Sequence, residues 1–150
     1  MTSEPTMHRP GERRHGVVAL VTSRERTRFF IQQKDEGYRP FPLGYSLFGG
    51  AIEAGEQPAE ALTRELREEL GAAAERLLAA GATCVLEGRT LATGVKVSLF
   101  EIVIEAAERE ALADVPVLEG LRGVVVEREV LRGMELVWGL HELVKVYLDR

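Results

Sequence analysis

Three glutamates crowd one predicted helix, and their spacing indicates a site for a divalent cation. Glu65, Glu68 and Glu69 stand at positions i, i+3 and i+4, so their carboxylates share one face of a helix. Like charges at this spacing repel each other by roughly a few tenths of a kcal/mol per pair. A bound cation would remove that repulsion, whereas without one the pattern describes a solvated acidic helix face.

The donor atoms determine which cation is expected. Carboxylate oxygens select hard cations, and Mg²⁺ typically takes one or two carboxylates together with waters and substrate phosphates. No histidine or cysteine stands near the three glutamates in the sequence, which argues against zinc. We therefore expect Mg²⁺ (or Mn²⁺) and a phosphorylated ligand.

The loop before this helix carries candidate groups for binding that ligand. Glycine and proline interrupt any regular pattern between residues 37 and 50, and aromatic residues are interleaved with them. The paired Gly49 and Gly50 allow the backbone to turn tightly and to approach a ligand. Arg39 is a candidate to pair with phosphate and Tyr45 to stack on a base, although half or more of such loop aromatics simply pack under the loop.

The spacing of these residues resembles a known motif. From Gly50 there are five residues to Glu56, seven more to Arg64, and then the run RELREELGA, which ends at Ala72. This resembles the Nudix box, Gly-x5-Glu-x7-Arg-Glu-U-x-Glu-Glu-x-Gly-U, in which U is a bulky aliphatic residue. Every fixed position matches. Ala72 is smaller than the usual aliphatic residue, and Phe48 stands where proline commonly precedes the paired glycines.

The resemblance implies hydrolysis of a nucleoside diphosphate linked to another group X. In this chemistry water attacks phosphorus and a P–O bond of the pyrophosphate breaks. The metal-binding glutamates of the family correspond to Glu65, Glu68 and Glu69, and the family's structural ion pair corresponds to Glu56 and Arg64. We predict catalytic roles for Glu65, Glu69 and Arg64, with Glu65 as the general base.

Acidic residues outside the motif are further candidates for the general base, because in this family the base sometimes lies in a distant loop. These candidates are Glu101, Glu105 and Glu119, each of which could also be an ordinary surface residue. Gly71 has a structural role in the motif, since it stands where a glycine cap is expected to end the helix.

The elements that position these residues follow from local patterns. The apolar run 17–21 predicts a buried strand, residues 29–31 its hairpin partner, and residues 51–52 a short strand. Pro58 opens a helix that continues to residue 70. Its predicted core-facing residues are Ala59, Leu62, Leu66 and Leu70.

Further strands are predicted over 82–87, 95–104 and 124–126, with a loop or short helical turn over 106–113. An amphipathic helix is predicted over 135–148, with Trp138 close to its apolar stripe. This order predicts an α/β fold with a mixed sheet between helices, and the resemblance implies the Nudix-type α/β/α sandwich. Residues 1–14 are expected to form a flexible N-terminal tail and residues 15–150 a single Nudix hydrolase domain.

Composition narrows the choice of partners and compartment. The net charge is −5 and the pI about 5.3, which disfavours nucleic acid but not a phosphorylated small molecule bound through a cation. The sequence shows no apolar run long enough to span a membrane and no secretory signal, so we expect a cytoplasmic protein. The lone Cys84 excludes an internal disulfide and is expected to be a small buried side chain. Many proteins of this family form homodimers.

Two alternatives of the same fold remain open. A sensor module would bind a nucleotide without turnover, although it would have little need of all three glutamates. A prenyl diphosphate isomerase would use a cysteine and a proton-donating glutamate, but Cys84 lies well outside the motif. A structural protein with an acidic helix is the third and least specific reading.

Overall fold

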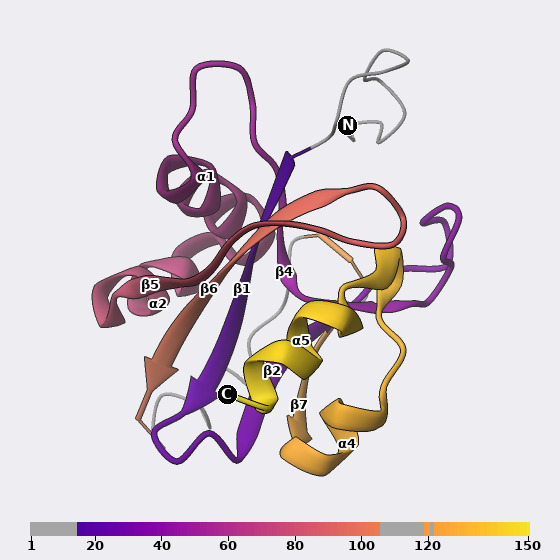
Figure 1. The fold of residues 1–150 in the computed structure, drawn as a ribbon. Coiled ribbons are helices and arrows are strands. Elements are labelled where there is room, and N and C mark those ends of the chain that lie inside the picture. The colour runs from indigo at the N-terminus through magenta and orange to yellow at the C-terminus, as the bar shows by residue number, and fades with distance from the viewer. Residues whose placement is uncertain (1–14, 106–118, 121) are drawn as a thin grey trace.

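The computed structural model describes residues 15–105, 119–120 and 122–150. The predicted tail over 1–14 and the predicted loop or turn over 106–113 lie outside the described residues. Within the described part the chain forms a seven-stranded mixed sheet with helices on both faces (Figure 1), as predicted.

The sheet is centred on β1 (His15–Ser23). β6 (Lys96–Ile104) runs parallel to it, and β5 (Ala82–Thr90) is antiparallel to β6 at the edge of the sheet. The other side of β1 pairs with two strands in succession, β4 (Phe48–Ala51) along its first half and β2 (Arg28–Gln33) along its second. β2 in turn pairs with β3 (Tyr45–Ser46) and β7 (Arg122–Glu127).

The sheet divides the core into two apolar clusters, and helices cover the cluster on each of its faces. α1 (Pro58–Leu70) and α2 (Ala74–Ala80) cover one face, whereas α4 (Arg128–Gly133) and α5 (His141–Leu148) cover the other. β1 serves both clusters because successive side chains of a strand point to opposite faces. Val17, Ala19 and Val21 pack under α1, and Val18 and Leu20 pack under α5.

The predicted helix over the glutamate motif is confirmed, with one change in its buried face. Leu62, Leu66 and Leu70 are buried as expected, but Ala59 is exposed and Ala61 is buried instead. Ala59 lies in the first turn, before the helix meets the sheet. Gly71 does have a positive φ of 59°, yet the chain continues through the 3₁₀ turn Gly71–Ala73 into α2, which local patterns did not predict.

Two predicted elements have different bounds in the structure. The short strand is β4, which ends at residue 51 and runs through the paired glycines. Its Phe48 is fully buried and stacks on Phe30, with ring centroids 5.1 Å apart. The predicted helix over 135–148 begins only at His141, because Trp138 and Gly139 have φ values of 60° and 82° within the 3₁₀ turn Val137–Gly139.

Two side chains are less buried than predicted. Cys84 on β5 is exposed, because β5 is an edge strand whose first residues face solvent. Trp138 is half-buried and packs against the margin of the cluster under α5. None of the described helices is both long and apolar enough to cross a membrane.

Candidate metal centre

α1 presents two of the three clustered glutamates of the motif, Glu65 and Glu69, to the sheet. Leu62, Leu66 and Leu70 fix the rotation of the helix by packing into the apolar cluster beneath it. That rotation turns Glu65 and Glu69 toward β4. Glu69 is only 1% exposed, and one of its carboxylate oxygens, Oε1, accepts a hydrogen bond from the backbone N–H of Gly49 at 2.9 Å.

The paired glycines of β4 allow this close approach. Gly49 has a φ of 143°, and a Cβ there would lie 2.0 Å from the carbonyl oxygen of Val17 on the neighbouring strand. A Cβ on Gly50 would lie 2.4 Å from the carboxyl carbon of Glu65. Both positions therefore lack room for a side chain, and at Gly50 the room is occupied by the carboxylate of Glu65.

Arg64 ties the helix to the segment that precedes it. Its guanidinium donates to both oxygens of Glu56 at 2.7 and 3.0 Å, and to the carbonyl oxygen of Ala51 at 3.0 Å. The same group donates to Glu65 at 3.0 Å and to Glu68 at 3.3 Å. Arg64 thus orients the acidic face as well as closing the loop, which agrees with the predicted pairing of Glu56 and Arg64.

A third carboxylate reaches the centre from a distant part of the chain. Carboxylate oxygens of Glu65, Glu69 and Glu119 all lie within 4.8 Å of one another. Glu119 is exposed and precedes β7. It was one of three candidates outside the motif, and the sequence pattern alone could not distinguish it from the other two.

The other two outside candidates are engaged elsewhere. Glu101 is buried, accepts two hydrogen bonds of 3.1 Å from Arg26 and one from the hydroxyl of Tyr147. Glu105 follows the end of β6 and pairs with Arg24. Neither belongs to the carboxylate group around Glu69 among the described residues.

Glu68 is separated from Glu65 and Glu69. Its side chain is 49% exposed and faces Arg64, and it does not belong to the group of close carboxylates found in the described residues. The sequence predicts that Glu65, Glu68 and Glu69 share one site. In the structure Glu68 lies at the rim of the group formed by the other two. The reason is rotational: only residues 65 and 69 lie on the flank of the apolar stripe that faces β4.

The surroundings raise the pKa values of the two inner carboxyls. Burial raises the pKa of Glu65, against the hydrogen bond from Arg64. Burial also raises the pKa of Glu69 well above its usual range, and Glu65 and Glu119 add to the effect, while Lys34 and the Gly49 N–H oppose it. Lys34 lies just past the end of β2, and nothing in the sequence pattern indicated that it would influence this site.

Of the residues predicted to bind ligand, Gly49 and Gly50 adjoin the clustered glutamates, whereas Arg39 and Tyr45 make other contacts. Arg39 is exposed and donates to the carbonyl oxygen of Glu36 at 3.1 Å. Tyr45 is half-buried and lines a cavity of about 510 Å³ together with Phe41 and Trp138. In this cavity the Phe41 and Trp138 rings meet edge to face at 5.0 Å, and the indole N–H of Trp138 donates to the Tyr38 hydroxyl at 2.7 Å.

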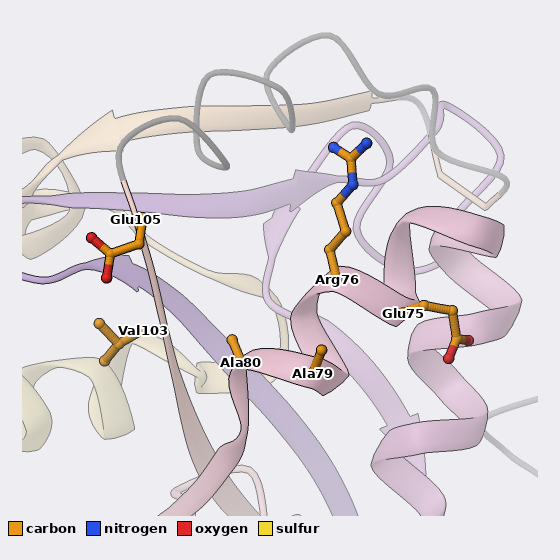
Figure 2. A pocket seen from close by; sticks show the side chains of 6 residues that line it. All are labelled: Glu75, Arg76, Ala79, Ala80, Val103 and Glu105. Atoms are coloured by element: carbon orange, nitrogen blue, oxygen red, sulfur yellow. The ribbon is translucent and has the colours of Figure 1, made fainter.

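A second hollow, of about 530 Å³, lies between α2 and the end of β6 (Figure 2). Its lining residues are Glu75, Arg76, Ala79, Ala80, Val103 and Glu105. Figure 2 shows Glu75 pointing away from it, toward Arg67 of α1, to which it is bonded at 2.7 Å. None of the clustered carboxylates lines this hollow, so we assign it no part in the chemistry.

Comparisons with known proteins find one matching family model and many similar structures. The family model of the NUDIX domain matches residues 12–90. A MutT protein from Methanosarcina mazei Go1 is similar in structure, with a TM-score of 0.67 and 20% identity over 95% of this chain and 97% of that one. DR0079 from Deinococcus radiodurans gives a TM-score of 0.68 and 21% identity over 93% and 88%.

A functionally described neighbour is the dihydroneopterin triphosphate pyrophosphohydrolase of E. coli. Its TM-score is 0.64 and its identity 16%, over 90% of this chain and 94% of that one. No curated protein matches the chain in sequence. The structural likenesses, all at low identity, establish the fold.

Proposed function

The chain belongs to the Nudix family of pyrophosphohydrolases, and from this premise we propose that it hydrolyses a nucleoside diphosphate linked to a group X with the help of Mg²⁺ or Mn²⁺. The observation that carries the proposal is the cluster of carboxylate oxygens from Glu65, Glu69 and Glu119. Three oxygen donors within 4.8 Å of one another suit a hard divalent cation.

The proposed ligands of the cation are Glu65, Glu69 and Glu119, with Glu68 contributing from the rim. A bound cation would neutralise phosphate oxygens and lower the pKa of a water molecule. The clustered glutamates repel one another without it, and Arg64 compensates only those that it touches. The centre is therefore built to gain stability from a cation that a diphosphate also binds.

The chain's own residues would then carry the proton and orient the attack. In the proposed reaction a water oxygen bonds to phosphorus, the bridging P–O bond breaks, and Glu65 takes the proton as general base. The nucleotide or X-phosphate leaves with the electron pair of the broken bond. Arg64 is a positioning residue, because it contacts Glu65 and ties it to Glu56 and to the carbonyl oxygen of Ala51. Glu69 holds the inner side of the site through Gly49.

Recognition of X is assigned to the aromatic cavity. Tyr45 lines it and is followed after three residues by Gly49, so the cavity and the metal centre are joined by a short stretch of chain. A cavity of this size can hold a drug-sized ligand, and its ring faces suit a base or another planar group. Arg39 is proposed as a phosphate contact from the outer loop.

Location and partners follow the same reasoning. We propose a cytoplasmic enzyme that acts on a small phosphorylated molecule and not on nucleic acid, because the net charge of −5 opposes polyanion binding. We propose a homodimer because many proteins of this family form one. The isomerase alternative loses its support, since Cys84 lies exposed on β5 at the far side of β6.

A hydrolysis assay with a matched variant tests the function. The protein is incubated with a panel of nucleoside diphosphate compounds and Mg²⁺ or Mn²⁺, and the phosphate-containing products are measured. Loss of an outer-shell partner of a metal costs about 10–100-fold, so loss of a direct ligand in Glu69→Gln should lower kcat by about 100-fold or more. Glu129→Gln, which changes an exposed carboxylate on α4, should match the wild type.

Other outcomes separate the alternatives. Tight binding of a compound without turnover of any of them would contradict the enzyme and support the nucleotide-binding sensor. Rearrangement of a prenyl diphosphate without uptake of water would instead support an isomerase. Equal rates for the wild type and Glu69→Gln would remove the metal centre from the mechanism.

A further inference from the structure

A buried glutamine holds the segment that carries the third carboxylate. Gln32 lies near the end of β2 and is completely buried. Its amide nitrogen Nε2 donates a hydrogen bond of 2.9 Å to the backbone carbonyl oxygen of Glu119. Glu119 lies outside the strand pairing of β7, which begins at residue 122, so this hydrogen bond ties its backbone to β2.

The backbone next to Glu119 is shaped to meet this amide. Gly120 has a φ of 89°, and a Cβ on it would lie 2.9 Å from Nε2 of Gln32 and 3.1 Å from the carbonyl oxygen of Gln33. Only glycine combines this backbone conformation with such a close approach. The turn at Gly120 and the amide of Gln32 are therefore in close contact, and this contact fixes the backbone of Glu119 beside β2.

The other atom of the amide shows that packing alone does not explain Gln32. Its carbonyl oxygen Oε1 is the single buried side-chain polar atom without a hydrogen-bond partner in the described part of the chain. Burying an unpaired acceptor costs free energy. A methionine of similar shape would fill the same space without that cost, so what the amide contributes is the bond that it donates.

We propose that Gln32 is a positioning residue of the metal centre, which holds Glu119 within reach of Glu65 and Glu69 through its hydrogen bond to the Glu119 carbonyl. This inference rests on the proposed function, in which these three carboxylates bind the cation. Outer-shell groups that orient metal ligands are a recurrent part of such centres. Here the outer-shell group lies on a rigid strand and the ligand in a connecting segment, so the strand determines the position of the ligand.

The test compares the variant Gln32→Met with a variant of the neighbouring buried glutamine, Gln33. Mn²⁺ binding is measured by calorimetry in the absence of substrate, and thermal stability by circular dichroism. Gln32→Met should weaken Mn²⁺ binding about 10-fold without lowering the unfolding temperature, because it also removes the unpaired acceptor. Raising the Mn²⁺ concentration should restore hydrolysis, since the variant loses cation affinity and not a reacting group.

The matched control is Gln33→Met on the same strand. Both polar ends of Gln33 are bonded, Nε2 to the carbonyl oxygen of Leu43 at 3.0 Å and Oε1 to Arg122 at 2.9 Å. This variant should therefore lower the unfolding temperature and leave Mn²⁺ affinity unchanged. The two neighbouring glutamines are expected to show opposite effects, which a general loss of packing would not produce.

A second variant tests the contact between Gln32 and residues 119–120 by changing Gly120. Gly120→Ala should weaken Mn²⁺ binding to a similar degree, and combining it with Gln32→Met should add little, because both changes break the same contact. Glu119→Gln supplies the reference for losing the ligand itself. Wild-type Mn²⁺ affinity in Gln32→Met, or in Glu119→Gln, would overturn the inference. If Glu69→Gln also bound Mn²⁺ like the wild type, the proposed function itself would fail.

Discussion

At the scale of single residues, the site depends on where side chains are absent as much as on where they are present. Gly50 was expected to bind substrate through its backbone. That role stays a prediction, and the structure adds a steric one, because the carboxyl group of Glu65 occupies the space that a side chain on residue 50 would fill. Gly49 similarly brings its N–H to Glu69. The glycines therefore define the position of the acidic residues across from them.

This steric role predicts the effect of one added methyl group. Gly50→Ala should displace the flexible end of Glu65 while the fold persists, because the backbone of β4 at this position has an ordinary negative-φ conformation. We expect kcat to fall about 10–100-fold, the range for misplaced outer-shell groups, with little change in unfolding temperature. Steady-state kinetics and thermal denaturation measure the two quantities.

The control for this prediction is Gly133→Ala at the end of α4, where an added Cβ meets nothing within 4 Å. It should retain full activity, and removal of a glycine should leave stability equal or slightly higher. Full activity of Gly50→Ala would show that Glu65 does not need its present position.

At the scale of elements, α1 is held to β4 by both packing and charge. The apolar face sets its rotation, and Arg64 links it to Glu56 and to the carbonyl of Ala51. Glu56 also accepts a hydrogen bond from the backbone N–H of Glu53 at 2.8 Å. The connection between strand and helix is thus closed by one half-buried guanidinium, which explains why a glutamate and an arginine eight residues apart act together.

The ion pair predicts a specific pH dependence of stability. The hydrogen bonds from Arg64 lower the pKa of Glu56 from 4.5 to about 2. A lowered pKa means that the native state favours the ionised form, so this stabilisation is complete above pH 4.5 and is lost as the pH falls toward 2. Glu56→Gln should therefore be less stable than the wild type at pH 7, and the difference should narrow between pH 4.5 and 2.

Unfolding midpoints measured across pH 2–7 test this dependence. Glu53→Gln is the control, because its carboxylate is 66% exposed and lies 3.7 Å from Arg64, a geometry that contributes little to stability. A difference between Glu56→Gln and the wild type that stays constant over the whole range would contradict the assignment.

At the scale of the whole molecule, the candidate metal centre joins two parts of the chain that are far apart in sequence, the unit of β4 and α1 and the segment before β7. β4, α1 and the segment before β7 meet there because β1 and β2 lie side by side at the centre of the sheet. Such a centre exists only in the folded chain, and a cation that binds it must stabilise the fold.

This coupling gives a prediction for the holoprotein. Free Mn²⁺ at about 100 times its Kd should add about 2.7 kcal/mol to the free energy of unfolding. For a domain of this size that corresponds to a rise of about 5–11 °C in the unfolding temperature. Thermal denaturation with and without Mn²⁺ measures the shift, which Glu69→Gln should reduce strongly. An equal shift in both proteins would place the bound cation elsewhere.

The sequence by itself determined the family, the α/β fold and the glutamate-bearing helix, because these depend on local order. Residues 50–72 lie within one strand–loop–helix unit, and an apolar period of a helix or strand is visible in neighbouring residues. The pairing of Glu56 with Arg64 follows from the same short range.

Only the tertiary structure decided which carboxylates meet. Helical spacing alone grouped Glu68 with Glu65 and Glu69, but the packing of α1 on the sheet turned Glu68 outward. Glu119 was indistinguishable from Glu101 and Glu105 until strand pairing brought β7 beside β2. The 3₁₀ turn before His141 also contains a long-range contact, since Trp138 is hydrogen-bonded to Tyr38, a hundred residues away. Contacts across such distances leave no periodic signal in the sequence, because they arise from how the elements pack and not from the order of neighbouring residues.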